Sequence, residues 1–228
     1  MAVDDVVKLV QAFANLLSVL VWPALLTFVL IRFGPSLKDF FSSLGEFSFK
    51  GAGFEATARR KQEAAAALMA AAVARPDAAA TPESTARDAK EAASIVGQVD
   101  KRTLRRASGA WALWVDDRPD NNVYERQSLE ALGVRFVIAK STDEALAKMA
   151  QQRFDVVISD MARPPDAQAG YTLLETLRAA GNHVPFIIYA GSSAAAHKAE
   201  AQRRGALGST NRASELFAYV LSALKREG

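Results

Sequence analysis

Apolar and polar positions follow a regular pattern from about residue 110 to the end of the chain. Short runs of branched and aromatic residues alternate there with stretches in which apolar residues recur at helical spacing. Unbroken apolar runs indicate buried strands, and the spacing of three to four residues indicates amphipathic helices. The pattern predicts strands at 110–115, 134–140, 154–160, 184–191 and 206–210. It predicts a loop followed by a helix within 118–133, and helices at 141–152, 170–181, 193–205 and 213–227.

Strands that alternate with helices along the chain are typical of a parallel sheet covered by helices on both faces. Five such units fit within residues 109–228. We therefore predict an α/β domain there, a flavodoxin-like, doubly wound sheet of five parallel strands. In this architecture functional sites lie at the carboxyl ends of the strands.

A different pattern precedes this domain, because no charged residue occurs from Leu9 to Ile31. A helix of that length spans about 30 Å, the thickness of the hydrocarbon core of a bilayer. Two aspartates precede the segment, which is not typical of a cleaved signal peptide. Arg32 and Lys38 follow it, and basic residues on that side favour a cytoplasmic location for the C-terminal part of the chain. We predict a single transmembrane helix within residues 1–35 of a bacterial inner-membrane protein, with the N-terminus outside and the C-terminal domain cytoplasmic.

The residues between these two parts are expected to connect them. For residues 36–75 we predict a short amphipathic helix, a small β-hairpin at 46–56 and an Ala-rich helix from Glu55 to about Ala74. That helix has strong helix propensity but few large apolar side chains, so self-association and a solvated spacer both remain open. Residues 76–108 are expected to be a linker that includes one further helix from Pro82 to Val99.

Composition narrows the classes of function. The formal net charge of +3 is too small to indicate a nucleic-acid partner, and the absence of cysteine excludes disulfides, thiolate catalysis and cysteine-based zinc sites. The sequence contains no recognisable catalytic triad, glycine-rich phosphate loop or zinc motif. We therefore expect a protein that is not an enzyme.

Three carboxylates mark the carboxyl ends of two predicted strands. Asp116 and Asp117 follow the first strand, and Asp160 follows the third. Parallel strands end at one edge of the sheet, so these side chains are expected to form one oxygen-rich pocket. Such a pocket suits Mg²⁺, which prefers carboxylate and carbonyl oxygens.

At this point the chain resembles the response-regulator receiver domain from about Trp111 to Leu224. The resemblance rests on "WVDD", on "VVISDM", on a following Pro and Gly with "LL", and on "GALG" before the last strand. It implies that Asp116 and Asp117 bind Mg²⁺ and that Asp160 also contacts the metal and accepts a phosphoryl group from a histidine kinase. It further implies that the carbonyl of Met161 is a metal ligand.

Two positions depart from the receiver pattern. Receivers carry Ser or Thr at the end of the fourth strand, where this chain has Tyr189, and Ser192 or Ser193 is the nearest hydroxyl beyond it. Receivers also carry a Lys after the fifth strand, where the register here gives Arg212. The metal-binding half of the pattern is therefore kept and the switch half is altered, as in an atypical receiver.

Arginines are expected near the same pocket. Arg118, Arg163 and Arg212 all follow predicted strands, and together they would favour a phosphate-bearing ligand such as a nucleotide. The alternative is that Arg118 and Arg163 pair with the acidic residues. Tyr124 and Glu125, just after the first acidic loop, are interpreted as helix-surface residues.

These features predict a membrane-anchored signalling or interaction protein that responds to phosphorylation or ligand binding at an Asp/Mg²⁺ pocket. Its expected partners are the lipid bilayer, a histidine kinase or other signalling protein, and further copies of itself. One alternative is a self-assembling membrane effector of the anti-phage defence type, with a receiver-like or TIR-like sensing domain. A TIR-like NAD-cleaving enzyme is a further alternative, but its catalytic Glu cannot be placed in this sequence.

Overall fold

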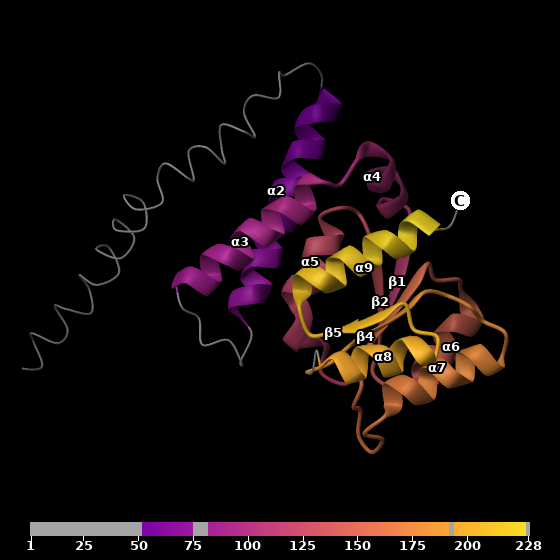
Figure 1. Ribbon diagram of the computed structural model, residues 1–228. Helices are drawn as coiled ribbons and strands as arrows, with labels where there is room; N and C mark the ends of the chain where they lie inside the picture. The colour runs from indigo at the N-terminus through magenta and orange to yellow at the C-terminus, as the bar shows by residue number, and fades with distance from the viewer. Residues whose placement is uncertain (1–51, 75–81, 192–193, 227–228) are drawn as a thin grey trace, which may run out of the picture. The chain divides into compact units, whose positions relative to one another are not determined.

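A five-stranded parallel sheet forms the centre of the protein. The computed structural model describes residues 52–74, 82–191 and 194–226, and residues from Ala56 onward form one compact unit. The strand order is β2-β1-β3-β4-β5, which confirms the predicted doubly wound sheet (Figure 1). The strands are β1 (Trp111–Val115), β2 (Arg135–Ala139), β3 (Val156–Ser159), β4 (Phe186–Tyr189) and β5 (Gly208–Thr210).

Helices connect the strands and also precede the sheet. Within the domain each predicted helix is present, and a short 3₁₀ turn leads into the first of them. Ser141 caps its helix by accepting a hydrogen bond from the Glu144 N–H at 3.1 Å. The helices are α2 (Ala52–Val73), α3 (Pro82–Gly97), α4 (Lys101–Ala107), η1 (Pro119–Asn122), α5 (Val123–Glu130), α6 (Thr142–Gln151), α7 (Ala169–Ala179), α8 (Ala195–Arg203) and α9 (Ala213–Arg226).

Alternating side chains of the strands build two cores, one on each face of the sheet. On β1, Trp114 points into the core shared with α5 and α9, whereas Leu113 points into the core shared with α6, α7 and α8. Trp114 is 1 % exposed and makes edge-to-face contacts with the rings of Phe136 at 6.0 Å and Tyr189 at 5.9 Å. This tryptophan therefore joins the first core to the end of β4.

The helices that precede the sheet form an additional layer over α5 and α9. Leu68 of α2 and Val96 of α3 lie in the same buried cluster as Trp114 and Phe217. Arg60 of α2 donates hydrogen bonds to the carbonyl oxygens of Ala131 and Leu132 at the end of α5. In Figure 1, α2 and α3 lie side by side next to α9.

Residues 82–108 are predicted from the sequence to be part of a linker, and the structure differs from this prediction. The helix predicted from Pro82 is present as α3, but α3 and α4 pack against α9 and belong to the compact unit. The reason is that Val96 and Val99 add apolar surface that the domain buries. Helices α3 and α4 are therefore part of the packed domain rather than of a linker.

The predicted hairpin at 46–56 is wrong in its second half, because residues 52–55 begin helix α2. An isolated hairpin is marginal in water, whereas these residues extend a helix of high propensity. The first half of the hairpin, the amphipathic helix and the segment Leu9–Ile31 lie outside the described residues. Among the residues that the structure does describe, no helix has the length and apolar character needed to cross a membrane.

The packing of α2 predicts different effects of two neighbouring substitutions. Leu68 is 2 % exposed and Met69 is 41 % exposed. Leu68→Ala should lower the free energy of unfolding by about 2–5 kcal/mol, because it removes buried methyl groups and leaves a cavity. Met69→Ala should change it by less than about 0.5 kcal/mol. Urea unfolding of both variants tests the prediction, and equal effects would show that α2 is a solvated spacer.

Candidate functional site

The register between β1 and β3 brings the predicted acidic residues together. Val115 pairs with Ser159, so the residues that follow them, Asp116 and Asp160, are neighbours at the carboxyl edge of the sheet. The Asp160 N–H donates to the Val115 carbonyl at 2.9 Å, which extends the pairing by one residue. The acidic pocket, defined as Asp116, Asp117 and Asp160, therefore lies at the edge that the sequence predicts.

The three carboxylates are close enough to share one cation. One oxygen from each of Asp116, Asp117 and Asp160 lies within 4.8 Å of the others. Asp116 is buried and is oriented by the Arg118 N–H at 2.7 Å and by Nδ2 of Asn122 at 2.7 Å. Three oxygen donors of this kind fit a hard divalent cation such as Mg²⁺.

The same proximity has an electrostatic cost in the absence of a cation. Burial raises the pKa of Asp160, and the charges of Asp116 and Asp117 raise it further. The Met161 N–H, which donates to Oδ1 of Asp160 at 2.7 Å, and the charge of Arg163 act in the opposite direction. The ionised form of Asp160 is therefore electrostatically destabilised, and a bound cation would stabilise it.

Two predicted arginines reach the acidic pocket in different ways. Arg118 is mostly exposed, and its Nε lies 3.5 Å from the Asp117 carboxylate. Arg163 is only 3 % exposed, and its guanidinium donates to the Ser159 hydroxyl and to the backbone carbonyl of Asp160. Of the alternatives left open by the sequence, pairing with the acidic residues describes Arg118, whereas Arg163 binds hydroxyl and backbone oxygens beside the carboxylates.

Backbone contacts fix the loop that follows Asp160. The Met161 carbonyl, predicted to be a metal ligand, accepts a hydrogen bond from the Gly170 N–H at 2.9 Å. A Cβ atom at Gly170 would lie 2.9 Å from the Asp160 carbonyl oxygen, so only glycine permits this close approach of α7. The start of α7 therefore supports the backbone at Asp160.

The first of the two positions that depart from the receiver pattern has a definite hydrogen-bond partner. The Tyr189 hydroxyl donates to Glu125 at 2.8 Å, and Glu125 is 6 % exposed. The interpretation of Glu125 as a surface residue is therefore wrong, because this carboxylate faces β4 from the first turn of α5. Ser192 lies outside the described residues.

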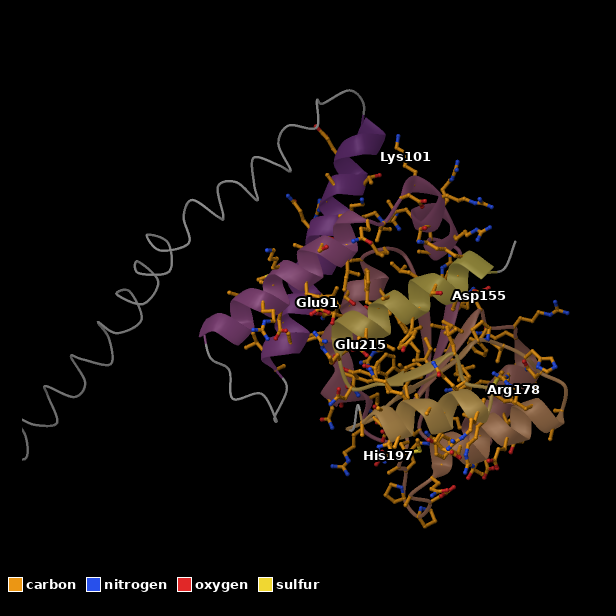
Figure 2. The ribbon with its side chains drawn as sticks, viewed as in Figure 1. Glu91, Lys101, Asp155, Arg178, His197 and Glu215 are labelled. Carbon is orange, nitrogen blue, oxygen red and sulfur yellow. The ribbon has the colours of Figure 1, made fainter. Side chains whose placement is uncertain are left out.

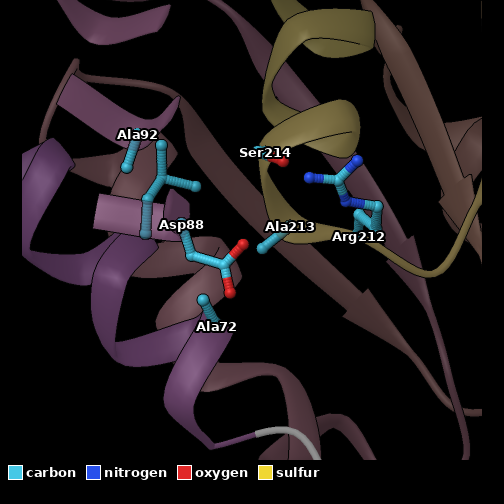
Figure 3. A pocket seen from close by; sticks show the side chains of 7 residues that line it. Ala72, Asp88, Ala92, Arg212, Ala213 and Ser214 are labelled. Carbon is cyan, nitrogen blue, oxygen red and sulfur yellow. The ribbon is translucent and has the colours of Figure 1, made fainter. Parts of the chain in front are cut away.

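Arg212 joins the receiver-like sheet to the preceding helices. Its guanidinium forms an ion pair with Glu91 of α3 and lies 3.6 Å from Glu215, while the Ser214 hydroxyl donates to Glu91 at 2.9 Å. Glu91 and Glu215 are labelled in Figure 2. Figure 3 shows Arg212 near Ser214, with Asp88 on the other side of the pocket that these residues line. Sequence reasoning missed Glu91, because no spacing rule links α3 to the end of β5.

Comparisons with known proteins identify the domain. Residues 112–211 match the family described as the response regulator receiver domain. The virulence sensor protein BvgS of Bordetella pertussis is 40% identical over 100 residues, and that of Bordetella bronchiseptica is 41% identical over 100 residues. Each match covers 42% of this chain but only 8% of the relative, so the chain corresponds to a small part of those proteins.

Solved structures are similar to about half of this chain. The receiver domain of the Francisella response regulator 1452 is 24% identical, with a TM-score of 0.48, and the alignment covers 52% of this chain and 99% of that one. The chemotaxis response regulator CheY4 of Vibrio cholerae is 27% identical, with a TM-score of 0.42 and coverage of 51% and 97%. The receiver-domain prediction is thus confirmed over 112–211 by the family match.

The raised pKa of Asp160 predicts that the stability of the folded protein depends on pH. Because the pKa of Asp160 is raised in the folded state, folding is favoured while this group is protonated and is weakened as the pH rises above its usual pKa of 3.8. In the presence of a chelator, Asp160→Asn should raise the melting temperature at pH 7, by about 4 °C at most because solvent screens this partly exposed group. The gain should disappear near pH 4.

Asp155→Asn is the matched control, because Asp155 lies at the amino end of β3 and accepts a hydrogen bond from the Trp111 N–H at 2.6 Å (Figure 2). It should give no stabilisation at pH 7. Thermal unfolding followed by circular dichroism measures both. A lower melting temperature for Asp160→Asn in chelator at pH 7 would contradict the electrostatic explanation.

Proposed function

We propose, on the premise that residues 112–211 form a response regulator receiver domain, that Asp160 accepts a phosphoryl group in a signalling reaction. Asp116, Asp117 and Asp160 would hold the Mg²⁺ that this chemistry uses. The donor would be a histidine kinase or another phosphorylated signalling protein. The observation that carries the proposal is the convergence of the three carboxylates within 4.8 Å at the carboxyl edge of a receiver fold.

The transfer can be written with its bonds balanced. An Oδ atom of Asp160 forms a bond to phosphorus while the P–N or P–O bond of the donor breaks. The leaving group departs with the electron pair, and an imidazole nitrogen then takes up a proton whereas acetate leaves as the anion. A bound divalent cation would neutralise charge on the carboxylates and on the phosphoryl oxygens. Asp116, held by Asn122 and the Arg118 N–H, would keep its oxygens directed at the pocket.

The output of the domain would pass through the layer of helices that precedes it. Arg212 follows β5, which is two strands away from β3, so its backbone lies roughly 10 Å from the Asp160 strand end. The Arg212 guanidinium is paired with Glu91 of α3. A phosphoryl dianion on Asp160 would compete with Glu91 for this arginine and so change how α3 packs on α9.

Membrane anchoring is part of the same proposal. The uncharged segment Leu9–Ile31 would cross the bilayer and hold the receiver domain at the cytoplasmic face of the inner membrane. Copies of the chain would associate there, which would make the position of α2 and α3 a signal between neighbours. Fractionation of cells and the mass of the detergent-solubilised protein test both points.

Phosphoryl transfer predicts a specific covalent product. Incubation of the full-length protein with acetyl phosphate and Mg²⁺ should add the mass of one phosphoryl group, and Asp160→Asn should lose the adduct completely. A chelator should abolish the reaction in the unchanged protein, because the carboxylates then repel the anionic donor. Intact-mass spectrometry measures the product.

Asp155→Asn provides the control, since Asp155 precedes β3 and should not affect the reaction. An adduct that persists in Asp160→Asn would place the acceptor elsewhere. Absence of any adduct in the unchanged protein, with acetyl phosphate or with a purified histidine kinase, would remove phosphorylation from the proposal.

A further inference from the structure

The acidic pocket rests on a buried arginine. Arg163 comes from the loop after β3 and is 3 % exposed. Its charge interacts with Asp116, Asp117 and Asp160, yet its hydrogen bonds go to backbone and hydroxyl oxygens around them. The guanidinium therefore binds the backbone next to the pocket, and it forms no direct ion pair with any of the three carboxylates.

The contacts of Arg163 join four elements of the fold. Nη1 donates to the Ser159 hydroxyl at 2.7 Å and to the Asp160 carbonyl at 2.5 Å, at the end of β3. The same nitrogen lies 3.5 Å from the Val115 carbonyl at the end of β1. Nη2 reaches the first residues of two helices, through the Thr142 hydroxyl of α6 at 3.2 Å and the Ala169 carbonyl of α7 at 2.9 Å.

Only a guanidinium can make this set of contacts. Its planar group carries donors on separate nitrogens at fixed angles, whereas an ammonium group is a single point with three donors. A buried charge is tolerated where acceptors and opposite charges surround it, and here both are present. Burial lowers the pKa of Arg163, while Asp160, Asp116 and Asp117 raise it.

We propose that Arg163 is a positioning residue that holds the ends of β1 and β3 in the geometry the acidic pocket needs to bind a divalent cation. This inference rests on the proposed function of the pocket. The positive charge of Arg163 by itself disfavours a second cation nearby, so any benefit must come from the positions it gives to Asp116 and Asp160. Loss of the positive charge alone would therefore strengthen Mg²⁺ binding, whereas loss of the positions that Arg163 gives to Asp116 and Asp160 would weaken it.

Three variants separate geometry from charge. Arg163→Lys keeps the charge and loses the planar group, and Arg163→Gln loses both. Thr142→Val removes a single acceptor and is the mild variant if the others unfold. If geometry dominates, Mg²⁺ affinity should fall about 10–100-fold in both Arg163 variants, the usual effect of losing an orienting residue behind a metal ligand. Thr142→Val should show a smaller fall in the same direction.

Arg178 supplies a matched control. In the last turn of α7 it donates to the carbonyl oxygens of Asn182, Val184 and Gly205, so it also joins several backbone segments (Figure 2). These carbonyls precede β4 and β5, at the opposite edge of the sheet from the acidic pocket. Arg178→Lys should lower stability without changing Mg²⁺ affinity.

The experiment combines two measurements on the full-length protein and its variants. Calorimetric titration with MgCl₂ gives the affinity, and amide hydrogen exchange without metal gives local opening. The Asp160 and Gly170 amides, which donate to Val115 and Met161 at 2.9 Å, report on the pocket. The Leu207 amide, which donates to Phe186 at 2.7 Å, reports on the opposite edge.

The expected result is weaker Mg²⁺ binding and faster exchange at Asp160 and Gly170 in Arg163→Lys, with Leu207 unchanged. Arg178→Lys should give the reverse exchange pattern. Unchanged or tighter Mg²⁺ binding in Arg163→Gln, or unchanged exchange at Asp160 in Arg163→Lys, would overturn the proposal. If the unchanged protein binds no Mg²⁺, the proposed metal function fails, and the exchange pattern still decides whether Arg163 positions the pocket.

Discussion

The parallel pairing of β1 with β3 is the constraint on which the site depends. Because Val115 lies opposite Ser159, the chain continues on both strands into a carboxylate, and Asp116 and Asp160 meet at one edge. Like charges at that separation repel each other, and burial of Asp160 adds to the cost. The fold must therefore hold in place a group of side chains that would separate if the strand ends were free.

The structure meets this cost with hydrogen bonds and with one buried positive charge. Asn122 and backbone N–H groups satisfy oxygens of Asp116 and Asp160, and Arg163 binds the backbone that carries them. Gly170 lets the first turn of α7 approach the Asp160 carbonyl closely. Nearby groups from β1, β3, η1 and α7 thus act on a pocket that none of them could form alone.

The layer of α2, α3 and α4 packs against the receiver domain within the same chain. Leu68, Val96 and Leu104 share the core of α5 and α9, and Glu91 pairs with Arg212 after β5. Many of the other buried side chains of α2 are alanines, which bury little apolar surface each. The layer therefore rests on a few large side chains and on the ion pair between Arg212 and Glu91.

The sequence by itself determined the five strand and helix units, the acidic strand ends and the receiver pattern, because these depend on local periodicity and on spacing along the chain. Only the tertiary structure decided that Arg163 supports the pocket from beneath, that Glu125 is buried against Tyr189, and that Glu91 reaches Arg212. It also showed that the segment predicted to be a linker forms helices that pack against α9. These outcomes depend on contacts between residues far apart in the chain, and such contacts follow from packing, which local patterns do not specify.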